Sequence, residues 1–143
     1  VEHLPISLLI GILGWLFGGG WVCVPLALVV GWCIDVDHLY DFGYYCFQHQ
    51  NPPDWSMIRS GEYFSKNAKI FVPLHSWELS LILVTSLGFF TQNWHLAITT
   101  TVAHMAHLIQ DMRAYNVRLL GYSFIFRALH AFKQRGFCSS SVS

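Results

Sequence analysis

Two long stretches of the chain contain no Asp, Glu, Lys or Arg. They run from His3 to Ile34 and from Leu79 to Gln110 and are equal in length. A membrane-spanning helix needs about 20 apolar residues, so each stretch is too long for one helix and slightly short for two. Each stretch also breaks near its middle, at Gly18-Gly19-Gly20 and at Thr91-Gln92-Asn93. The pattern therefore predicts two helical hairpins, with arms at about 4–17, 21–34, 77–90 and 94–110.

The segment between the hairpins, 35–74, is polar and contains Asn51-Pro52-Pro53-Asp54, which predicts a loop. A structureless loop of about 40 residues is unusual in a compact domain, so we expect at least one short helix near 55–67. After the second hairpin, 119–133 is an amphipathic candidate that would lie against a membrane surface. The predicted fold class is all-α: a small helical membrane bundle of two hairpins plus a C-terminal amphipathic helix, in one domain over residues 1–143.

The composition favours a lipid environment. Hydrophobic residues make up 54% of the chain and charged residues 11%, against about a quarter charged in a soluble domain. The net charge of zero gives no basic stripe, so nucleic acid is not an expected partner. Cys23, Cys33, Cys46 and Cys138 form no Cys-x-x-Cys pair, which argues against a zinc ribbon. A soluble four-helix bundle with very apolar helices is the alternative, because the arms are short.

The basic residues predict how the hairpins are oriented. All eight Lys and Arg residues fall in the central loop or after the fourth arm. Two hairpins place those regions and the N-terminus on the same side of the membrane. By the positive-inside rule that side is cytoplasmic, so we expect a protein of the inner (cytoplasmic) membrane whose polar face lies toward the cytoplasm.

With this topology the polar residues collect at one end of the bundle. His3 opens the first arm, Asp35 to His38 close the second, His75 opens the third, and His107 to Asp111 close the fourth. Histidines and carboxylates from neighbouring helices are a common way to build a metal site inside a bundle. Ionisable groups at membrane depth also favour a functional interpretation.

Asp35, Asp37 and His38 form the first cluster, at the predicted end of the second arm. A helix C-terminus carries partial negative charge, so two carboxylates there gain nothing from the helix dipole. A metal cation would compensate them. The alternative is a solvated helix end with a cap.

The second cluster contains His104, His107 and Asp111, whose spacing places them along one helical stripe. A His and an Asp four residues apart can bind one ion, or the Asp can orient the imidazole. The alternative is a hydrogen-bonded group in the core.

The third cluster is His75, Ser76 and Glu78. Ser76 is a plausible N-cap and Glu78 suits the first turn of a helix. Either Glu78 or Asp37 is a candidate general base if it reaches a bound water. The other three histidines, His49, His95 and His130, have no such neighbours and are predicted to be structural.

These residues, in this order, resemble the YdjM-like family of LexA-binding, inner-membrane-associated, metal-dependent hydrolases. In that family a His near the first helix matches His3, and a Pro-Asp-x-Asp-His motif matches 35–38, with Ile34 in place of the Pro. A Thr-His-Ser motif matches 74–76, with Leu74 in place of the Thr, and the Arg usual before it is missing. A His-x-x-x-Asp motif followed by a Gly-Val-x-Leu-Leu-like segment matches 107–111 and then 116–120.

Together the residues and the resemblance predict a hydrolase of phosphoester or lipid-like substrates that uses a metal-activated water. The imidazoles favour Zn²⁺, and the carboxylates leave Mn²⁺ or Mg²⁺ open. The predicted ligands are Asp35, His75, His107 and Asp111, with further ligands or supporting groups at His3, Asp37, His38 and His104. The alternatives are a non-catalytic metal-binding or transport module, and a membrane scaffold held by a buried hydrogen-bond network.

Overall fold

The structure is a computed structural model that describes residues 3–50, 52, 54–60, 62–67 and 69–133. Cys138 lies outside these residues. The described chain is helical and contains no strand, as the sequence predicted. Its helices are α1 (His3–Gly14), α2 (Cys23–Cys33), α3 (Asp37–His49), α4 (Trp55–Ser60), α5 (Glu62–Lys66), α6 (Trp77–Thr91), α7 (Trp94–Tyr115) and α8 (Phe124–Leu129).

The first hairpin turns at the three consecutive glycines, as the sequence predicted. A π-helical turn, Trp15–Gly19, follows α1, and Gly18 and Gly20 have φ of 96° and 82°. Residues with a side chain rarely adopt such backbone angles, so both positions favour glycine. The turn returns the chain as α2, which packs along α1.

The second hairpin also lies close to its prediction. At the start of α6, the Ser76 side chain accepts a hydrogen bond from the Leu79 amide (3.3 Å). At the start of α7, the Asn93 side chain accepts one from the Leu96 amide (3.0 Å). The fourth arm is longer than predicted, because nothing between Gln110 and Tyr115 breaks a helix. It ends at Asn116, which adopts a left-handed conformation with φ of 53°.

The second arm does not end at Ile34. A short 3-10 turn, Ile34–Val36, leads directly into α3, so the chain is helical from Cys23 to His49. The prediction of a polar loop over 35–74 was therefore wrong in its first part. The carboxylates of α3 do not stop the helix because they bind backbone amides of a distant segment, 71–74.

The rest of the central segment contains α4 and α5, within the region where a short helix was expected. The predicted C-terminal surface helix over 119–133 was too long. A 3-10 turn, Leu119–Tyr122, precedes α8, which has only six residues and starts at the N-cap Ser123. Arg127 of α8 is buried, so this helix turns its cation toward the protein.

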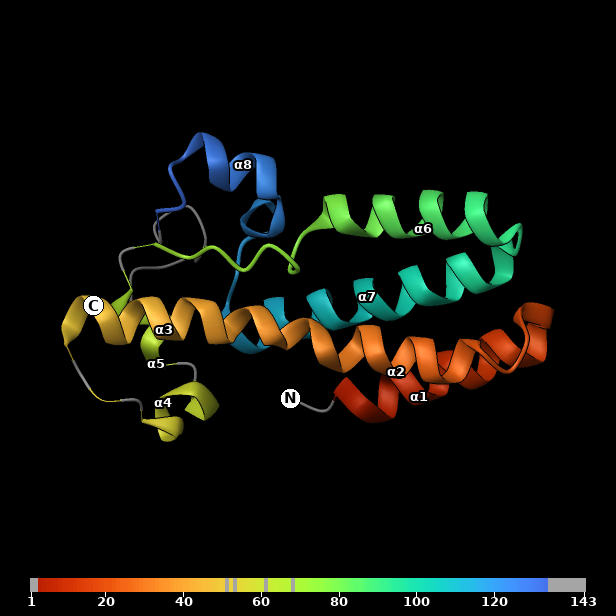
Figure 1. Ribbon diagram of the computed structural model, residues 1–143, viewed down its shortest axis with the longest axis horizontal. Helices are drawn as coiled ribbons and strands as arrows, with labels where there is room; N and C mark the ends of the chain where they lie inside the picture. The colour runs from red at the N-terminus through yellow and green to blue at the C-terminus, as the bar shows by residue number, and fades with distance from the viewer. Residues whose placement is uncertain (1–2, 51, 53, 61, 68, 134–143) are drawn as a thin grey trace.

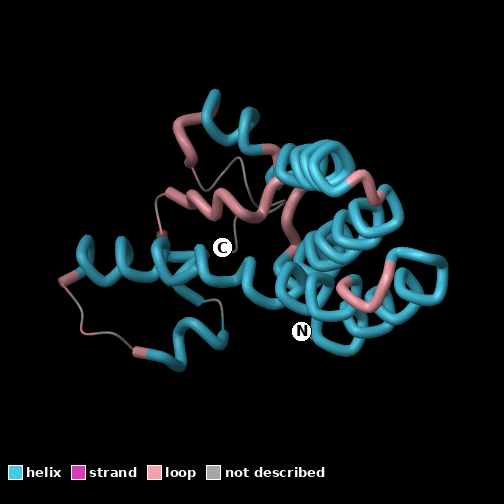
Figure 2. Tube along the Cα trace, turned by 45° about the vertical axis from the view of Figure 1, so that its right-hand side comes forward, coloured by secondary structure: helices cyan, strands magenta, loops and turns pink. Residues whose placement is uncertain are grey.

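The four hairpin helices group together, and α3 continues the line of α2 beyond them (Figure 1). Figure 2 shows α3 and α4 projecting from this bundle. One buried cluster, Ile70, Val72, Leu108, Val117 and Tyr122, joins the bundle to the segment before α6 and the chain after α7. The polar ends of the helices meet beside this cluster.

The outer surface of the hairpins is apolar. Leu16, Phe17, Leu81 and Phe90 are each at least 66% exposed. Among the residues that the structure describes, one helical run, Cys23–His49, is long and apolar enough to cross a membrane, and the apolar runs His3–Gly19 and Trp77–Thr91 are shorter. The four membrane-embedded arms therefore stay a prediction.

Candidate metal centre

Four predicted ligands come together where the helix ends meet. Asp35 comes from the turn between α2 and α3, His75 from the segment before α6, and His107 and Asp111 from α7. One ligand atom from each lies within 4.8 Å of all the others. The hairpin topology predicted this convergence.

The spacing of these atoms fits one small cation. The Nε2 atoms of His75 and His107 are 3.1 Å apart. Each Nε2 lies 3.2–3.4 Å from Asp35 Oδ1 and 3.1–3.3 Å from Asp111 Oδ2. Tetrahedral coordination at zinc bond lengths places neighbouring ligand atoms about 3.3–3.6 Å apart. Five of the six pair distances are therefore close to those of a four-coordinate ion.

The outer nitrogens of both imidazoles are held by acceptors. His75 Nδ1 lies 3.0 and 3.2 Å from the two carboxylate oxygens of Asp37, and His107 Nδ1 lies 2.9 Å from the carbonyl oxygen of Gly31. Because these oxygens only accept, both Nδ1 atoms carry a proton and donate it. In a neutral imidazole this leaves the Nε2 lone pair directed at the cluster, which is the usual arrangement of a metal-binding histidine.

Two facing lone pairs require a positive charge between them. Burial lowers the pKa of His75, but hydrogen bonds to Asp111, Asp35 and Asp37 raise that pKa well above its ordinary value. The carboxylates around His75 therefore favour a positive charge at the cluster, either a proton on an imidazole or a metal ion that displaces it.

His3 and His38 lie beside the cluster and contact its carboxylates. His3 Nε2 is 3.2 Å from Asp111 Oδ1, and its ring stacks on His107 with centroids 3.8 Å apart. His38 Nε2 is 3.5 Å from Asp35 Oδ1, and its Nδ1 is 3.0 Å from the Tyr63 hydroxyl. Both histidines are thus positioned to support the carboxylates.

Asp37, His38 and His75 form a second group with potential ligand atoms. However, His75 already uses Nδ1 toward Asp37 and Nε2 toward the first cluster. Its imidazole would have to lose both protons to bind two ions. Asp37 is therefore better interpreted as the group that orients His75 than as a ligand.

His104 is not part of either group. Its Nε2 donates to the carbonyl oxygen of Leu74 (2.9 Å), and its Nδ1 accepts from the Ser80 hydroxyl (2.8 Å). Both ring nitrogens are therefore occupied. The residue fixes the backbone next to His75, as a supporting group does.

The structure does not support Glu78 as a general base. Its carboxylate accepts hydrogen bonds from the Ser123 hydroxyl (2.6 Å) and from the amides of Phe124 (2.9 Å) and Ile125 (3.2 Å). These bonds cap the start of α8. Asp37, the other candidate base, accepts from the Leu74 amide (2.8 Å) in addition to His75. Both carboxylates thus have positioning roles.

Asp41 and Arg127 hold the segment that carries His75, and sequence reasoning missed both. Asp41 is fully buried and accepts from the amides of Phe71 (3.0 Å) and Val72 (3.0 Å). From α8, Arg127 donates hydrogen bonds to the carbonyl oxygens of Phe71, Val72 and His75. The four-residue spacing from Asp37 to Asp41 was an available signal, but only on a helix that continued past residue 34.

Replacing Arg127 tests how far this segment depends on its buried cation. Arg127→Met keeps most of the side-chain volume but leaves three carbonyl groups without their donor. We expect a loss of roughly 2–4 kcal/mol in the free energy of unfolding, because buried unsatisfied groups are costly. Thermal or denaturant unfolding measures this. Lys133→Met, which removes an exposed cation nearby, should change stability little, and an equal loss in both variants would contradict the assignment.

The cluster is accessible from one side. The Asp35 side chain is 38% exposed, whereas those of His75, His107 and Asp111 are at most 2% exposed. Of the exposed residues near Asp35 in the chain, Trp32, Val36 and Leu39 are apolar and Cys33 carries a thiol. The chain beside the exposed edge of the cluster therefore carries no other charge on its exposed side chains.

Comparisons of this chain with protein-family models, curated proteins and solved structures found no match. The resemblance to the YdjM-like hydrolases therefore stays a prediction. Its motif residues at 35–38, 75 and 107–111 are nevertheless those that the fold brings together.

Proposed function

We propose that this protein is a membrane-bound, metal-dependent hydrolase of phosphoester or lipid-like substrates. The observation that supports it best is the pair of buried Nε2 atoms, 3.1 Å apart and flanked by two carboxylate oxygens. Both imidazoles are locked through Nδ1 in the orientation that ligands require. A hydrogen-bonded scaffold does not need four ligand atoms at this spacing.

The ligand set favours zinc. Two imidazoles and two carboxylates whose ligand atoms lie 3.1–3.4 Å apart in five of the six pairs suit Zn²⁺. Mg²⁺ and Mn²⁺, by contrast, prefer octahedral oxygen sites. The negative charges of Asp35 and Asp111 would balance a divalent ion. His3 would then stabilise the outer oxygen of Asp111.

In a hydrolase, the ion would acidify a bound water and polarise the phosphoryl or carbonyl oxygen of the substrate. The surrounding residues would hold the liganding imidazoles in position. Asp37 fixes His75, Gly31 fixes His107, and the exposed edge at Asp35 gives the substrate its approach. The apolar residues around Asp35 would favour a substrate with an apolar portion over a fully polar one.

A non-catalytic metal-binding or transport module is the second candidate. The observation that favours it is the number of protein ligands, because four can close a tetrahedral site, whereas catalytic zinc usually keeps an open position. The exposure of Asp35 supports the hydrolase over this candidate, since Asp35 is reachable from outside.

Metal content and turnover test the proposal directly. We expect the purified protein to hold about one zinc ion per chain, and to hydrolyse at least one substrate in a panel of phosphomonoesters, phosphodiesters and lipid phosphates. A chelator should stop hydrolysis and zinc should restore it. His107→Ala should lose the ion, whereas His95→Ala, on an exposed side chain at the start of α7, should retain it. Bound zinc without any turnover would favour the non-catalytic module.

The proposed membrane topology is tested separately. In a background without native cysteines, we place single cysteines at Phe17 and Gln92, in the two hairpin turns, and at Lys69, in the central segment. A membrane-impermeant thiol reagent should label Lys69→Cys only from the cytoplasmic side, and the two turn positions only from the opposite side. Labelling of all three from the same side would contradict the two-hairpin topology.

A further inference from the structure

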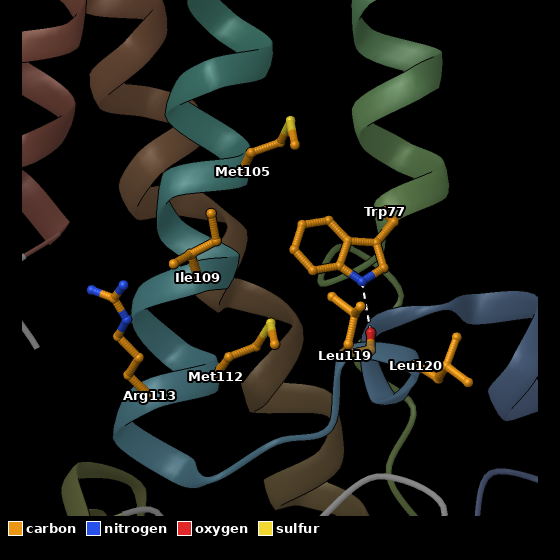
Figure 3. A pocket seen from close by; sticks show the side chains of 7 residues that line it. All are labelled: Trp77, Met105, Ile109, Met112, Arg113, Leu119 and Leu120. Atoms are coloured by element: carbon orange, nitrogen blue, oxygen red, sulfur yellow. Dashed lines mark hydrogen bonds between the residues drawn. The ribbon is translucent and has the colours of Figure 1, made fainter.

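A cavity of about 600 Å³ lies between the start of α6, the last turns of α7 and the 3-10 turn after it (Figure 3). Its volume is within the range of small-molecule sites, about 300–1,000 Å³. Its wall is almost entirely apolar. The apolar lining residues are Trp77, Met105, Ile109, Met112, Leu119 and Leu120.

This cavity is separate from the metal centre. On α7 the lining residues Met105, Ile109 and Met112 are turned by about 100–160°, roughly two-fifths of the helix circumference, from the stripe with His107 and Asp111. Tyr122 lies between the two sites, with its ring 5.9 Å from that of His75 and 6.4 Å from that of Trp77. The cavity is therefore not the entrance to the cluster.

The helices that form the cavity carry an apolar outer surface. Leu81 and Ile82 of α6 are 66% and 56% exposed, and Ile98 and Val102 of α7 are 52% and 45% exposed. Sugars and nucleotides would find few polar partners in such a wall. The two methionines are flexible and adapt to apolar chains of different shape.

One cation completes the cavity. Arg113 also lines it, and Figure 3 shows the guanidinium at the margin, extending away from Trp77. No carboxylate in the described part of the chain forms a salt bridge with Arg113. An apolar wall with a cation at its edge is complementary to an anion that carries an alkyl chain.

We propose that this cavity binds one anionic phospholipid of the bilayer. An acyl chain lies against Met105, Ile109 and Met112, and the phosphate is bound by Arg113. Because Tyr122 separates the two sites, this lipid is not the substrate of the metal centre. The proposal therefore goes beyond the hydrolase and shares with it only the membrane environment.

Native mass spectrometry of the full chain in a non-ionic detergent tests the site. EDTA is present throughout, so the result is independent of the metal centre. Phosphatidylglycerol and phosphatidylcholine with identical acyl chains are the probes. We expect one tightly retained phosphatidylglycerol per chain, bound about tenfold more strongly than phosphatidylcholine. Arg113→Gln should remove most of that preference, because the guanidinium attracts the net negative charge of phosphatidylglycerol, whereas the choline ammonium of phosphatidylcholine offsets the charge of its phosphate.

Ile109→Trp fills the cavity and should prevent retention of both lipids, and Met105→Trp should repeat the effect. Lys69→Gln and Leu9→Trp, which remove an exposed charge and enlarge an exposed apolar residue elsewhere, should bind like the wild type. Equal retention of the two lipids by the wild type would overturn the proposal. So would unchanged binding in both filled variants. If the wild type proves to be a dimer, and the filled variants lose the dimer without a change in lipid count, the proposal is also overturned and the cavity is an interface between copies of the chain.

Discussion

Asp111→Asn is expected to lower metal-dependent hydrolysis by more than about 100-fold. The substitution keeps the shape of the side chain but removes the charge that faces His75 and His107 at 3.3 and 3.1 Å. Loss of a group that merely supports a ligand typically costs about 10–100-fold in affinity or activity, and loss of a ligand should cost more. Added zinc should therefore restore the wild type at lower concentration than the variant.

The measurements are zinc affinity and the rate of hydrolysis as functions of free zinc. His95→Ala is the matched control on the same helix, because its side chain is exposed and belongs to neither ligand group. Circular dichroism should show that Asp111→Asn retains its helices. If both variants hydrolyse at the wild-type rate and a chelator has no effect, hydrolysis does not depend on this cluster, and the cluster is a buried hydrogen-bond network with a structural role.

The hairpins were predictable because the residues that determine them are close together in the sequence. The uncharged stretches and the turns at Gly18 and Gln92 determine where the chain reverses, and the reversals place the four helix ends together. No distant contact is needed for that inference. The convergence of Asp35, His75, His107 and Asp111 followed from it.

The continuation of α2 into α3 was not predictable in the same way. Asp35, Asp37 and Asp41 resemble a polar helix end when only neighbouring residues are considered. In the structure, Asp37 and Asp41 bind amides of the segment 71–74, more than 30 residues later. A helix that is stabilised by such remote partners has no local signal for where it ends.

The roles of some groups around the candidate ligands could not be inferred from the sequence, for a related reason. Glu78 was assigned to catalysis from its position near His75, but its direction is set by α8, which lies about 45 residues away in sequence. Arg127 was assigned to a surface helix, yet it donates to the carbonyl groups around His75. Residue type and spacing indicated candidate ligands that the fold brings together, whereas the role of each neighbour depends on tertiary contacts.

Asp37→Asn is the sharpest test of whether His75 is a ligand. Asp37 does not contribute an atom to the four-atom cluster, but its Oδ2 accepts the Nδ1 proton of His75 at 3.2 Å. A carboxylate in this position fixes the tautomer and makes the imidazole a better donor to a metal. Asparagine can keep one acceptor there but loses the charge, so zinc affinity should fall about 10–100-fold.

Asp41→Asn is the matched control for this substitution. Asp41 is one helical turn further along α3, is also buried, and also binds amides of the segment before α6, but it makes no contact with His75. Both variants should lose stability, because each weakens hydrogen bonds to buried amides. Only Asp37→Asn should weaken zinc binding beyond what its loss of stability accounts for. If the two variants lose zinc affinity equally, the carboxylates of α3 act only by holding the backbone, and the orientation of His75 does not depend on Asp37.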